Sequence, residues 1–203
     1  MREAELRSRL VRHLGASSST PTRAIPEFWI PVSHERADLV LVGRRLEAFE
    51  IKSAADDLLR LPRQVGAYGK VFDRCTAVVA EGHLDGASAL LPSWWGLMTF
   101  PATEANFGVV RACGDNPGVD QATLVRLLWK EEVRASLAGL GYPVRPQEAR
   151  ESMWDLLMAV VDAEQLRGIV RDVLYGRNPA AARFGSPILR SSLAFQEPAS
   201  ARS

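Results

Sequence analysis

The sequence contains little that would point to a disulfide framework, a membrane span or a highly charged surface. It has two cysteines, Cys75 and Cys113, which lack the spacing of a metal or redox motif and fall in apolar runs. We therefore expect reduced thiols in a core. The apolar runs are too short for a transmembrane helix, and the N-terminal residues lack the pattern of a signal peptide. These absences predict a cytoplasmic protein that does not contact a membrane.

Charge and length leave the function open but limit the architecture. The net charge of +1 neither requires nor excludes a nucleic-acid partner, although arginines cluster locally, as at Arg60 and Arg63. The 203 residues suffice for one domain, or for one domain with an appendage. We expect a core over 1–115, a helical extension over 116–175 and a disordered tail over 176–203, which is rich in Ala, Arg, Ser and Pro.

Apolar periodicity predicts the elements of the core. The strand that begins near residue 25 is bounded by Pro26 and Pro31, which favours an edge position in a sheet. In chain order we expect a helix over 2–14, strands over 25–32, 37–42 and 47–53, a helix over 62–72, a strand over 75–80, a short helix over 83–91, and strands over 94–100 and 106–113.

The C-terminal part is predicted to be helical. Helices are expected over 119–140, 148–161 and 163–175, with a turn at 141–143 between the first two. Two helices joined by a short turn that contains glycine are compatible with a DNA-binding helix-turn-helix. Packing of the helices on the core, or a homodimer contact through them, is the simpler interpretation. All three interpretations stay open at this point.

The stretch 47–53 carries the first candidate for a functional site. Side chains alternate faces along a strand, so Glu50 and Lys52 point the same way, while Phe49 and Ile51 point into a core. A carboxylate and an ammonium inside an apolar strand are unusual. The plain alternative is a surface hairpin whose Glu–Lys pair has little consequence.

A second acid, Asp38, lies on the preceding apolar strand. A loop of three residues between the two strands pairs Val42 with Leu46, and this register places Asp38 opposite Glu50 on one face. A loop of two residues would place the two acids on opposite faces. Two neighbouring buried acids repel unless a positive charge lies between them, and a divalent metal is the natural candidate because hard cations take carboxylate oxygens.

The helix expected from Pro62 follows directly after the second strand. Gln64 and Tyr68 are four residues apart and share one face of this helix. Two further acids are candidates for the same site. Glu5 borders the apolar side of the first helix, and Glu27 lies within the first strand, where it also suits the role of a charged edge-strand residue.

The ordered set of an acid, E-x-K and Q-x-x-x-Y resembles the PD-(D/E)xK nuclease superfamily, and the Q-x-x-x-Y helix resembles its RecB-like branch. Over roughly residues 25–100 the chain is more similar to an uncharacterised family of bacterial and phage-borne restriction-endonuclease-like proteins. A weaker similarity is to MmcB-like DNA-repair proteins. The residues that carry the resemblance are Asp38, Glu50, Lys52, Arg60-Leu61-Pro62, Gln64, Tyr68, Val71-Phe72-Asp73 and Trp94-Trp95-Gly96.

The resemblance implies a restriction-endonuclease-like α/β fold, with a central mixed sheet flanked by helices and a C-terminal helical extension. It implies Asp38 and Glu50 as ligands of Mg²⁺, for which Mn²⁺ substitutes, with the Ile51 carbonyl as a further ligand. Lys52 is then the catalytic lysine, and Gln64 and Tyr68 line the site. No Pro-Asp precedes the hairpin, and the acid of the first helix has no clear match, so Glu5 and Glu27 remain rival metal ligands.

The expected function is metal-dependent hydrolysis of DNA phosphodiester bonds in repair, mobile-element or phage-related processing. A divalent metal held by carboxylates supplies both a nucleophile near neutral pH and a counter-charge for the phosphoryl oxygens. The competing class is a non-catalytic module that uses the same fold to bind nucleic acid or protein. Buried charges cost stability, which argues against acids kept without a function.

Overall fold

A mixed sheet of six strands forms the centre of the molecule in the computed structural model, which describes residues 3–16, 20–100 and 107–177. The first three strands are antiparallel, β3, β4 and β5 are parallel, and β6 is antiparallel to β5. Their order in the sheet is their order in the chain: β1 (Arg23–Ile30), β2 (Glu35–Val42), β3 (Leu46–Lys52), β4 (Arg74–Ala80), β5 (Gly96–Phe100) and β6 (Gly108–Arg111).

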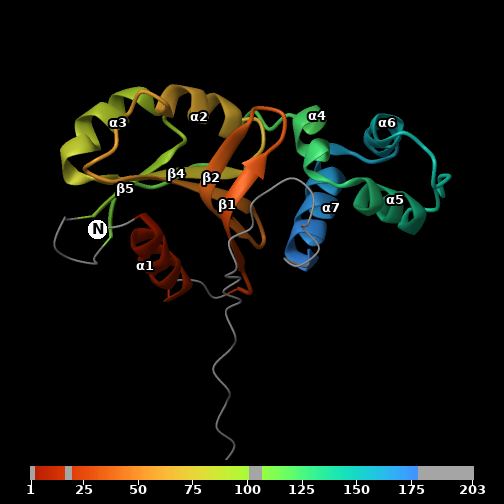
Figure 1. Ribbon diagram of the computed structural model, residues 1–203, viewed down its shortest axis with the longest axis horizontal. Coiled ribbons are helices and arrows are strands. Elements are labelled where there is room, and N and C mark those ends of the chain that lie inside the picture. Colours follow the sequence, from red (N-terminus) through yellow and green to blue (C-terminus); the bar gives the residue numbers. More distant parts are fainter. Residues whose placement is uncertain (1–2, 17–19, 101–106, 178–203) are drawn as a thin grey trace, which may run out of the picture.

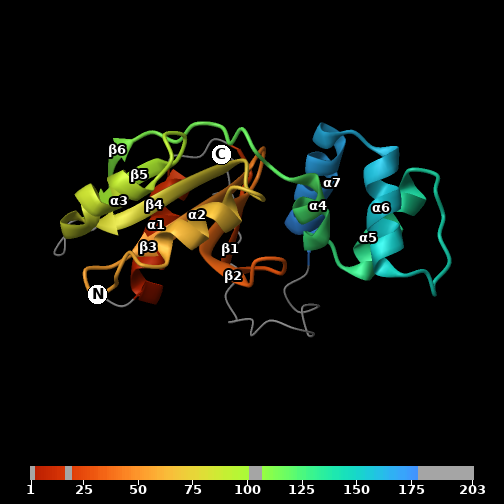
Figure 2. The same ribbon diagram turned by 90° about the horizontal axis from the view of Figure 1, so that it is seen from above.

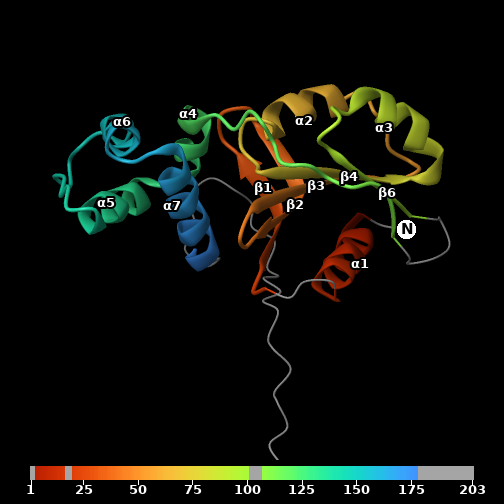
Figure 3. The same ribbon diagram turned by 180° about the vertical axis from the view of Figure 1, so that it is seen from behind.

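Helices cover both faces of this sheet (Figure 1). Helix α1 (Glu3–Ala16) lies on one face, where Leu6 and Leu10 pack in a cluster with Phe49 and Ile51 of β3. Helices α2 (Leu61–Tyr68) and α3 (Leu84–Leu90) lie on the other face, and a 3₁₀ turn η1 (Glu81–His83) precedes α3 (Figure 3). The predicted α/β class, with a mixed sheet and flanking helices, is confirmed.

The C-terminal helices form a group beside the β1 and β2 side of the sheet (Figure 2). Their buried residues belong to the same apolar cluster as the α2 face of the sheet, while the expected domain boundary near 115 stays a prediction. The group contains α4 (Gln121–Leu124), a 3₁₀ turn η2 (Val125–Leu127), α5 (Lys130–Gly139), α6 (Arg150–Val160) and α7 (Ala163–Gly176).

The prediction of one continuous helix over 119–140 is wrong. The backbone becomes extended at Leu128 and Trp129, with ψ of 133° and 162°, and a new helix begins at Lys130. The side chain of Glu132 accepts a hydrogen bond of 2.7 Å from the Trp129 N–H, which caps the new helix. Apolar spacing continued across the break because Leu127 and Leu128 are both buried, so periodicity alone did not reveal it.

Other expected boundaries differ by a few residues. Strand β1 lies at the edge of the sheet as expected, although it begins at Arg23 and ends before the turn that contains Val32. Trp94 and Trp95 precede β5 instead of opening it. The tail was expected from 176, but Gly176 still belongs to the last helix, and residues 2, 106 and 178–203 fall outside the described residues. No helix within the described ranges has the length and apolar character needed to cross a membrane.

Both cysteines are free thiols, as expected. Cys75 is buried in β4, and its burial raises the pKa of the thiol well above the usual value. Cys113 follows β6 and is only half-buried, although the apolar residues around it in the sequence predicted a core position.

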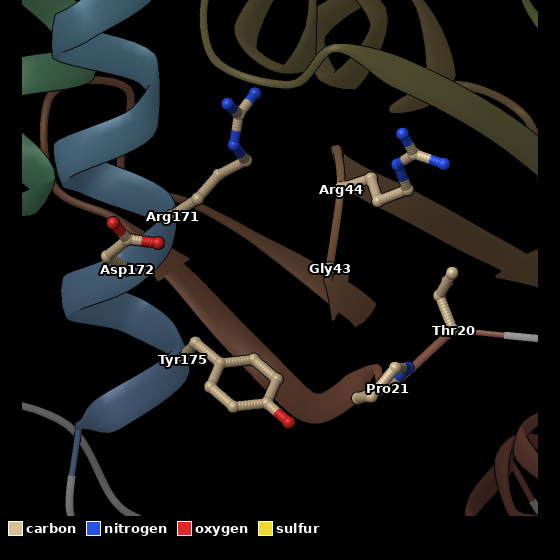
Figure 4. A pocket seen from close by; sticks show the side chains of 7 residues that line it. All are labelled: Thr20, Pro21, Gly43, Arg44, Arg171, Asp172 and Tyr175. Carbon is tan, nitrogen blue, oxygen red and sulfur yellow. The ribbon is translucent and has the colours of Figure 1, made fainter.

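A polar joint connects the sheet with α7. The carboxylate of Asp73 is 5% exposed and accepts a hydrogen bond of 2.7 Å from the Leu46 N–H at the start of β3. The same carboxylate lies 3.3 Å from a guanidinium nitrogen of Arg167 and 3.8 Å from one of Arg171. A hollow of about 420 Å³ lies beside this joint, between the β2–β3 hairpin tip at Arg44 and helix α7 (Figure 4).

Candidate active site

Strands β2 and β3 have the register that a three-residue loop predicts. Val42 pairs with Leu46, and the pairing continues to Leu39 opposite Phe49, so the next opposed positions are Asp38 and Glu50. The ladder between the two strands ends there. Strand β3 remains paired with β4 as far as Lys52 opposite Val79. The two strands therefore part at the acids and leave a fork in the sheet.

Asp38 bridges this fork. Its Oδ2 accepts a hydrogen bond of 2.6 Å from the Ile51 N–H, in place of a backbone carbonyl of β2. The alternation of side chains along β2 also shifts at this position. Ala37 and Leu39 would share a face in a regular strand, but Ala37 packs in the cluster on the α2 side of the sheet and Leu39 in the cluster on the α1 side. Asp38 thus sits where the strand alternation shifts, and its carboxylate lies between the two strands.

The neighbouring edge strand has the same irregularity. Pro26 pairs with Leu39 and Phe28 with Ala37, which leaves Glu27 opposite Asp38. Glu27 has a φ of 53°, a left-handed conformation that non-glycine residues seldom adopt. Strained backbone of this kind clusters at functional sites, where the surroundings enforce it.

Glu50 is the centre of a buried hydrogen-bond network. Its side chain is 2% exposed. Its Oε1 accepts a bond of 2.7 Å from the Lys52 ammonium and one of 2.5 Å from the Gln64 amide. Its Oε2 accepts a bond of 2.5 Å from the Tyr68 hydroxyl, which also lies 2.9 Å from the Arg36 carbonyl oxygen. Helix α2 supplies Gln64 and Tyr68 from one face, because they are one helical turn apart.

One polar atom of this network lacks a partner. The Gln64 Oε1 is buried and accepts no hydrogen bond within the described part of the chain. Buried polar groups are nearly always paired, so the unpaired amide oxygen next to a carboxylate needs an explanation, and a bound water or ion is one. The atoms at the fork that could bind a cation are carboxylate and amide oxygens, which hard cations prefer as ligands.

Burial and the neighbouring carboxylates raise the pKa of Tyr68 well above its ordinary value. Burial is the largest cause, followed by the negative charge of Glu50 and the hydrogen bond to it, and then by the charges of Asp38 and Glu35. All three carboxylates therefore act electrostatically on this hydroxyl. Tyr68 stays protonated at neutral pH and serves as a hydrogen-bond donor to Glu50.

The structure brings the five predicted side chains together at the fork. Asp38 binds the β3 backbone, and Glu50 holds Lys52, Gln64 and Tyr68. The two rival acids differ. Glu27 is opposed to Asp38 but forms ion pairs with Arg7 and with Arg36, the latter at 2.6 Å, whereas Glu5 is 53% exposed and pairs with Arg9 one turn along α1. This placement favours Glu27 over Glu5 as a further acid of the site.

Sequence reasoning missed one acid. Glu35 has a fully buried side chain and forms ion pairs with Arg60 and Arg63 at the start of α2. The shift of alternation at Asp38 brings Glu35 to the α2 face, and a regular strand pattern does not reveal it. The sequence did contain one sign of a buried acid near this helix: Arg60 and Arg63 are three residues apart and therefore point to the same side.

The residues at the fork fit a sparse divalent-cation site. No group of three or more His, Cys, Asp or Glu side chains suited to a metal occurs in the described segments. The fork instead offers two carboxylates, Asp38 and Glu50, with the unpaired amide oxygen of Gln64. Mg²⁺ commonly binds proteins through one or two carboxylates and keeps waters or substrate oxygens as its other ligands.

We expect Tyr68→Phe to lower stability at neutral pH and to change its alkaline dependence. The variant loses a hydrogen bond to a buried charge, which costs about 1.5–3 kcal/mol. In the wild type the folded state keeps a proton that the unfolded chain loses above pH 10 or so, because the pKa of Tyr68 is raised in the fold. Stability from this group is therefore complete below that pH and falls above it, by up to about 1.4 kcal/mol per pH unit.

Urea unfolding between pH 7 and pH 11 measures this effect. The stability difference between wild type and Tyr68→Phe should narrow as the pH rises above 10 or so, because only the wild type loses this contribution. The exposed Tyr142 offers a matched control, and Tyr142→Phe should change little at either pH. A difference that stays constant to pH 11 would contradict the described role of the Tyr68 hydroxyl.

These features define an α/β protein with a buried acid–lysine network at a fork between two strands. The chain belongs to the Bacteriophage P4 protein cII family, whose model matches residues 1–189. It is also similar to the solved structure of a protein of unknown function from Silicibacter pomeroyi, with 20% identity, a TM-score of 0.44, and coverage of 73% of this chain and 99% of that one. No curated protein matches the chain.

Proposed function

We propose that the protein is a metal-dependent nuclease that hydrolyses DNA phosphodiester bonds. The observation that supports this function is the buried network in which Glu50 holds Lys52, Gln64 and Tyr68 at the fork bridged by Asp38. Desolvating two charged side chains costs several kcal/mol per ion, and replacing such a pair by apolar residues is often stabilising. A catalytic role accounts for keeping it.

Each residue has a role in this proposal. Asp38 and Glu50 hold Mg²⁺ or Mn²⁺, with the Ile51 carbonyl and Glu27 as further candidate ligands. When bound, such an ion activates water and polarises a phosphoryl oxygen. The Lys52 ammonium has three donors, of which Glu50 takes one among the described residues, so the others are available to a phosphate oxygen and to its developing charge. Gln64 and Tyr68 hold Glu50 in place.

The resemblance to the PD-(D/E)xK superfamily supports the proposal through the same ordered residues. Its RecB-like branch, the uncharacterised restriction-endonuclease-like family and the MmcB-like proteins all remain proposed relationships. The name of the family refers to a protein of bacteriophage P4, which is compatible with the phage-related processing that we expect. The homodimer through the C-terminal helices also stays a prediction.

The test is incubation of the purified protein with linear and with circular DNA, in Mg²⁺, in Mn²⁺ and in chelator. We expect cleavage with either metal and none in chelator. Loss of circular DNA would indicate an endonuclease, and loss of linear DNA alone an exonuclease. If double-stranded DNA, single-stranded DNA and RNA all stay intact with both metals, the enzyme proposal must be abandoned.

One observation favours the non-catalytic alternative. Both carboxylate oxygens of Glu50 already accept hydrogen bonds, so this carboxylate has partners without a metal. A binding module predicts DNA or protein binding without cleavage, and melting temperatures that do not respond to Mg²⁺ or Mn²⁺. A metal-dependent rise in the melting temperature of the wild type that is lost in Asp38→Asn would contradict this alternative, since it reports ion binding to the folded state at the fork.

A further inference from the structure

Two exposed arginines share one buried acid at the start of α2. The side chain of Glu35 is fully buried, whereas those of Arg60 and Arg63 are 62% and 69% exposed. Arg60 reaches Glu35 through Nη2 at 3.3 Å, and Arg63 reaches it through Nε. A single negative charge therefore anchors two positive charges, and the cluster of Glu35, Arg60 and Arg63 carries a net charge of +1.

The anchored geometry leaves donors available on the outer side. Among the described residues, Arg63 binds Glu35 through its Nε–H, which leaves both terminal nitrogens of the guanidinium for a ligand, and Arg60 uses one terminal nitrogen. Guanidinium groups bind phosphate through paired N–H donors. Anchoring on Glu35 also restricts the side-chain rotamers before a ligand arrives, which reduces the entropy cost of binding.

The cluster shares its supporting elements with the candidate active site. Helix α2 carries Arg63 directly before Gln64, whose amide binds Glu50 at 2.5 Å. Strand β2 carries Glu35 three residues before Asp38, and the charge of Glu35 acts on the Tyr68 hydroxyl. A phosphate held by the two arginines is therefore next to the fork.

We propose that Arg60 and Arg63, anchored on Glu35, form a phosphate clamp that holds a nucleic-acid backbone beside the fork. That the bound molecule is a nucleic acid rests on the proposed function. The clamp adds to that function the residues that hold this substrate in position. Pockets for small ligands enclose most of the ligand surface, but both arginine side chains are more than 60% exposed. An extended strand lying across the surface suits them better than a free phosphate ion.

The test measures binding in chelator, where no cleavage can occur. Fluorescence anisotropy of labelled single-stranded and double-stranded oligonucleotides is compared for wild type and for Arg60→Gln/Arg63→Gln. Removing one charge-assisted hydrogen bond to a phosphate should weaken binding about tenfold, so the double variant should bind about a hundredfold more weakly. The salt dependence should decrease by about one unit of slope per arginine, equally for unrelated sequences.

A matched control removes the same charge elsewhere. Arg12 lies on α1, on the opposite face of the sheet from α2, and Arg44 lies at the tip of the β2–β3 hairpin; both are exposed, so Arg12→Gln/Arg44→Gln should leave binding within about twofold of wild type. Arg60→Lys/Arg63→Lys keeps the charge without the guanidinium fork and should bind between wild type and the Gln variant. Melting temperatures report whether each variant folds.

The possible results separate the clamp from the nuclease. Binding by Arg60→Gln/Arg63→Gln that equals wild type overturns the clamp even if wild type cleaves DNA. An equal loss in the control variant overturns it as well, because net charge alone would then explain binding. Inorganic phosphate that competes at micromolar concentration would show a small-anion site instead of a strand contact. Clamp-dependent binding without any cleavage supports the clamp and removes the nuclease.

Discussion

Lys52→Ala is expected to lower the rate of metal-dependent DNA cleavage about 10²–10³-fold. Enzymes lose rate by a similar factor when one hydrogen-bond donor that stabilises the developing charge of a transition state is removed. The Lys52 ammonium is buried beside Glu50, so its removal takes a positive charge from the point where a phosphate oxygen would arrive. Single-turnover cleavage at saturating protein measures the rate without the binding step. The fold should persist at lower stability, because Glu50 loses its buried ion-pair partner while Gln64 and Tyr68 still donate to it.

Asp38→Asn is expected to abolish cleavage by a different route. The asparagine keeps an oxygen that can accept the Ile51 N–H, so the fork should keep its geometry. The substitution removes one of two neighbouring negative charges, so the metal-free variant should be slightly more stable than wild type. The rise in melting temperature caused by Mg²⁺ or Mn²⁺ should shrink, because a ligand stabilises only as far as it binds the folded state.

Lys70→Ala is a suitable control for these two variants, since Lys70 is an exposed lysine on the segment after α2. It should cleave and melt like wild type. Full cleavage by Lys52→Ala would remove the lysine from the proposed chemistry. An unchanged metal-dependent shift in Asp38→Asn would show that the ion binds elsewhere, whatever happens to cleavage.

The register of the hairpin was predictable from the sequence because loop length and side-chain alternation act locally. A loop at 43–45 requires Val42 opposite Leu46, and the opposition of Asp38 and Glu50 follows from that pair. The spacing of Gln64 and Tyr68 likewise placed them on one helix face. These parts of the site depend on neighbours within a few residues, which the sequence displays directly.

The fork itself was not predictable in this way. It depends on the left-handed Glu27 in a neighbouring strand and on the shift of alternation at Asp38, and neither has a local signature in residue type. The burial of Glu35 follows from that shift. Its ion pairs reach residues 25 and 28 positions along the chain, so they appear only when β2 and α2 are placed together.

Asp73→Ala is expected to be among the most destabilising substitutions outside the apolar core. It leaves the Leu46 N–H without its acceptor and removes the counter-charge of Arg167 and Arg171, which lie on α7. Breaking a buried ion pair costs about 3–5 kcal/mol, and the lower end of about 3 kcal/mol applies because the arginines are partly exposed. Thermal unfolding at pH 7 should show a melting temperature lower by roughly 6–12 °C.

Two further variants divide this destabilisation into its parts. Asp73→Asn keeps an acceptor for the Leu46 N–H but no charge, so it should lose less stability than Asp73→Ala. Asp172 lies on α7, as Arg167 and Arg171 do, but it is exposed and borders the hollow beside the joint. Asp172→Ala should therefore change stability by no more than about 0.5 kcal/mol. Equal melting temperatures for Asp73→Ala and Asp172→Ala would mean that the sheet and α7 are held together by their apolar contacts alone.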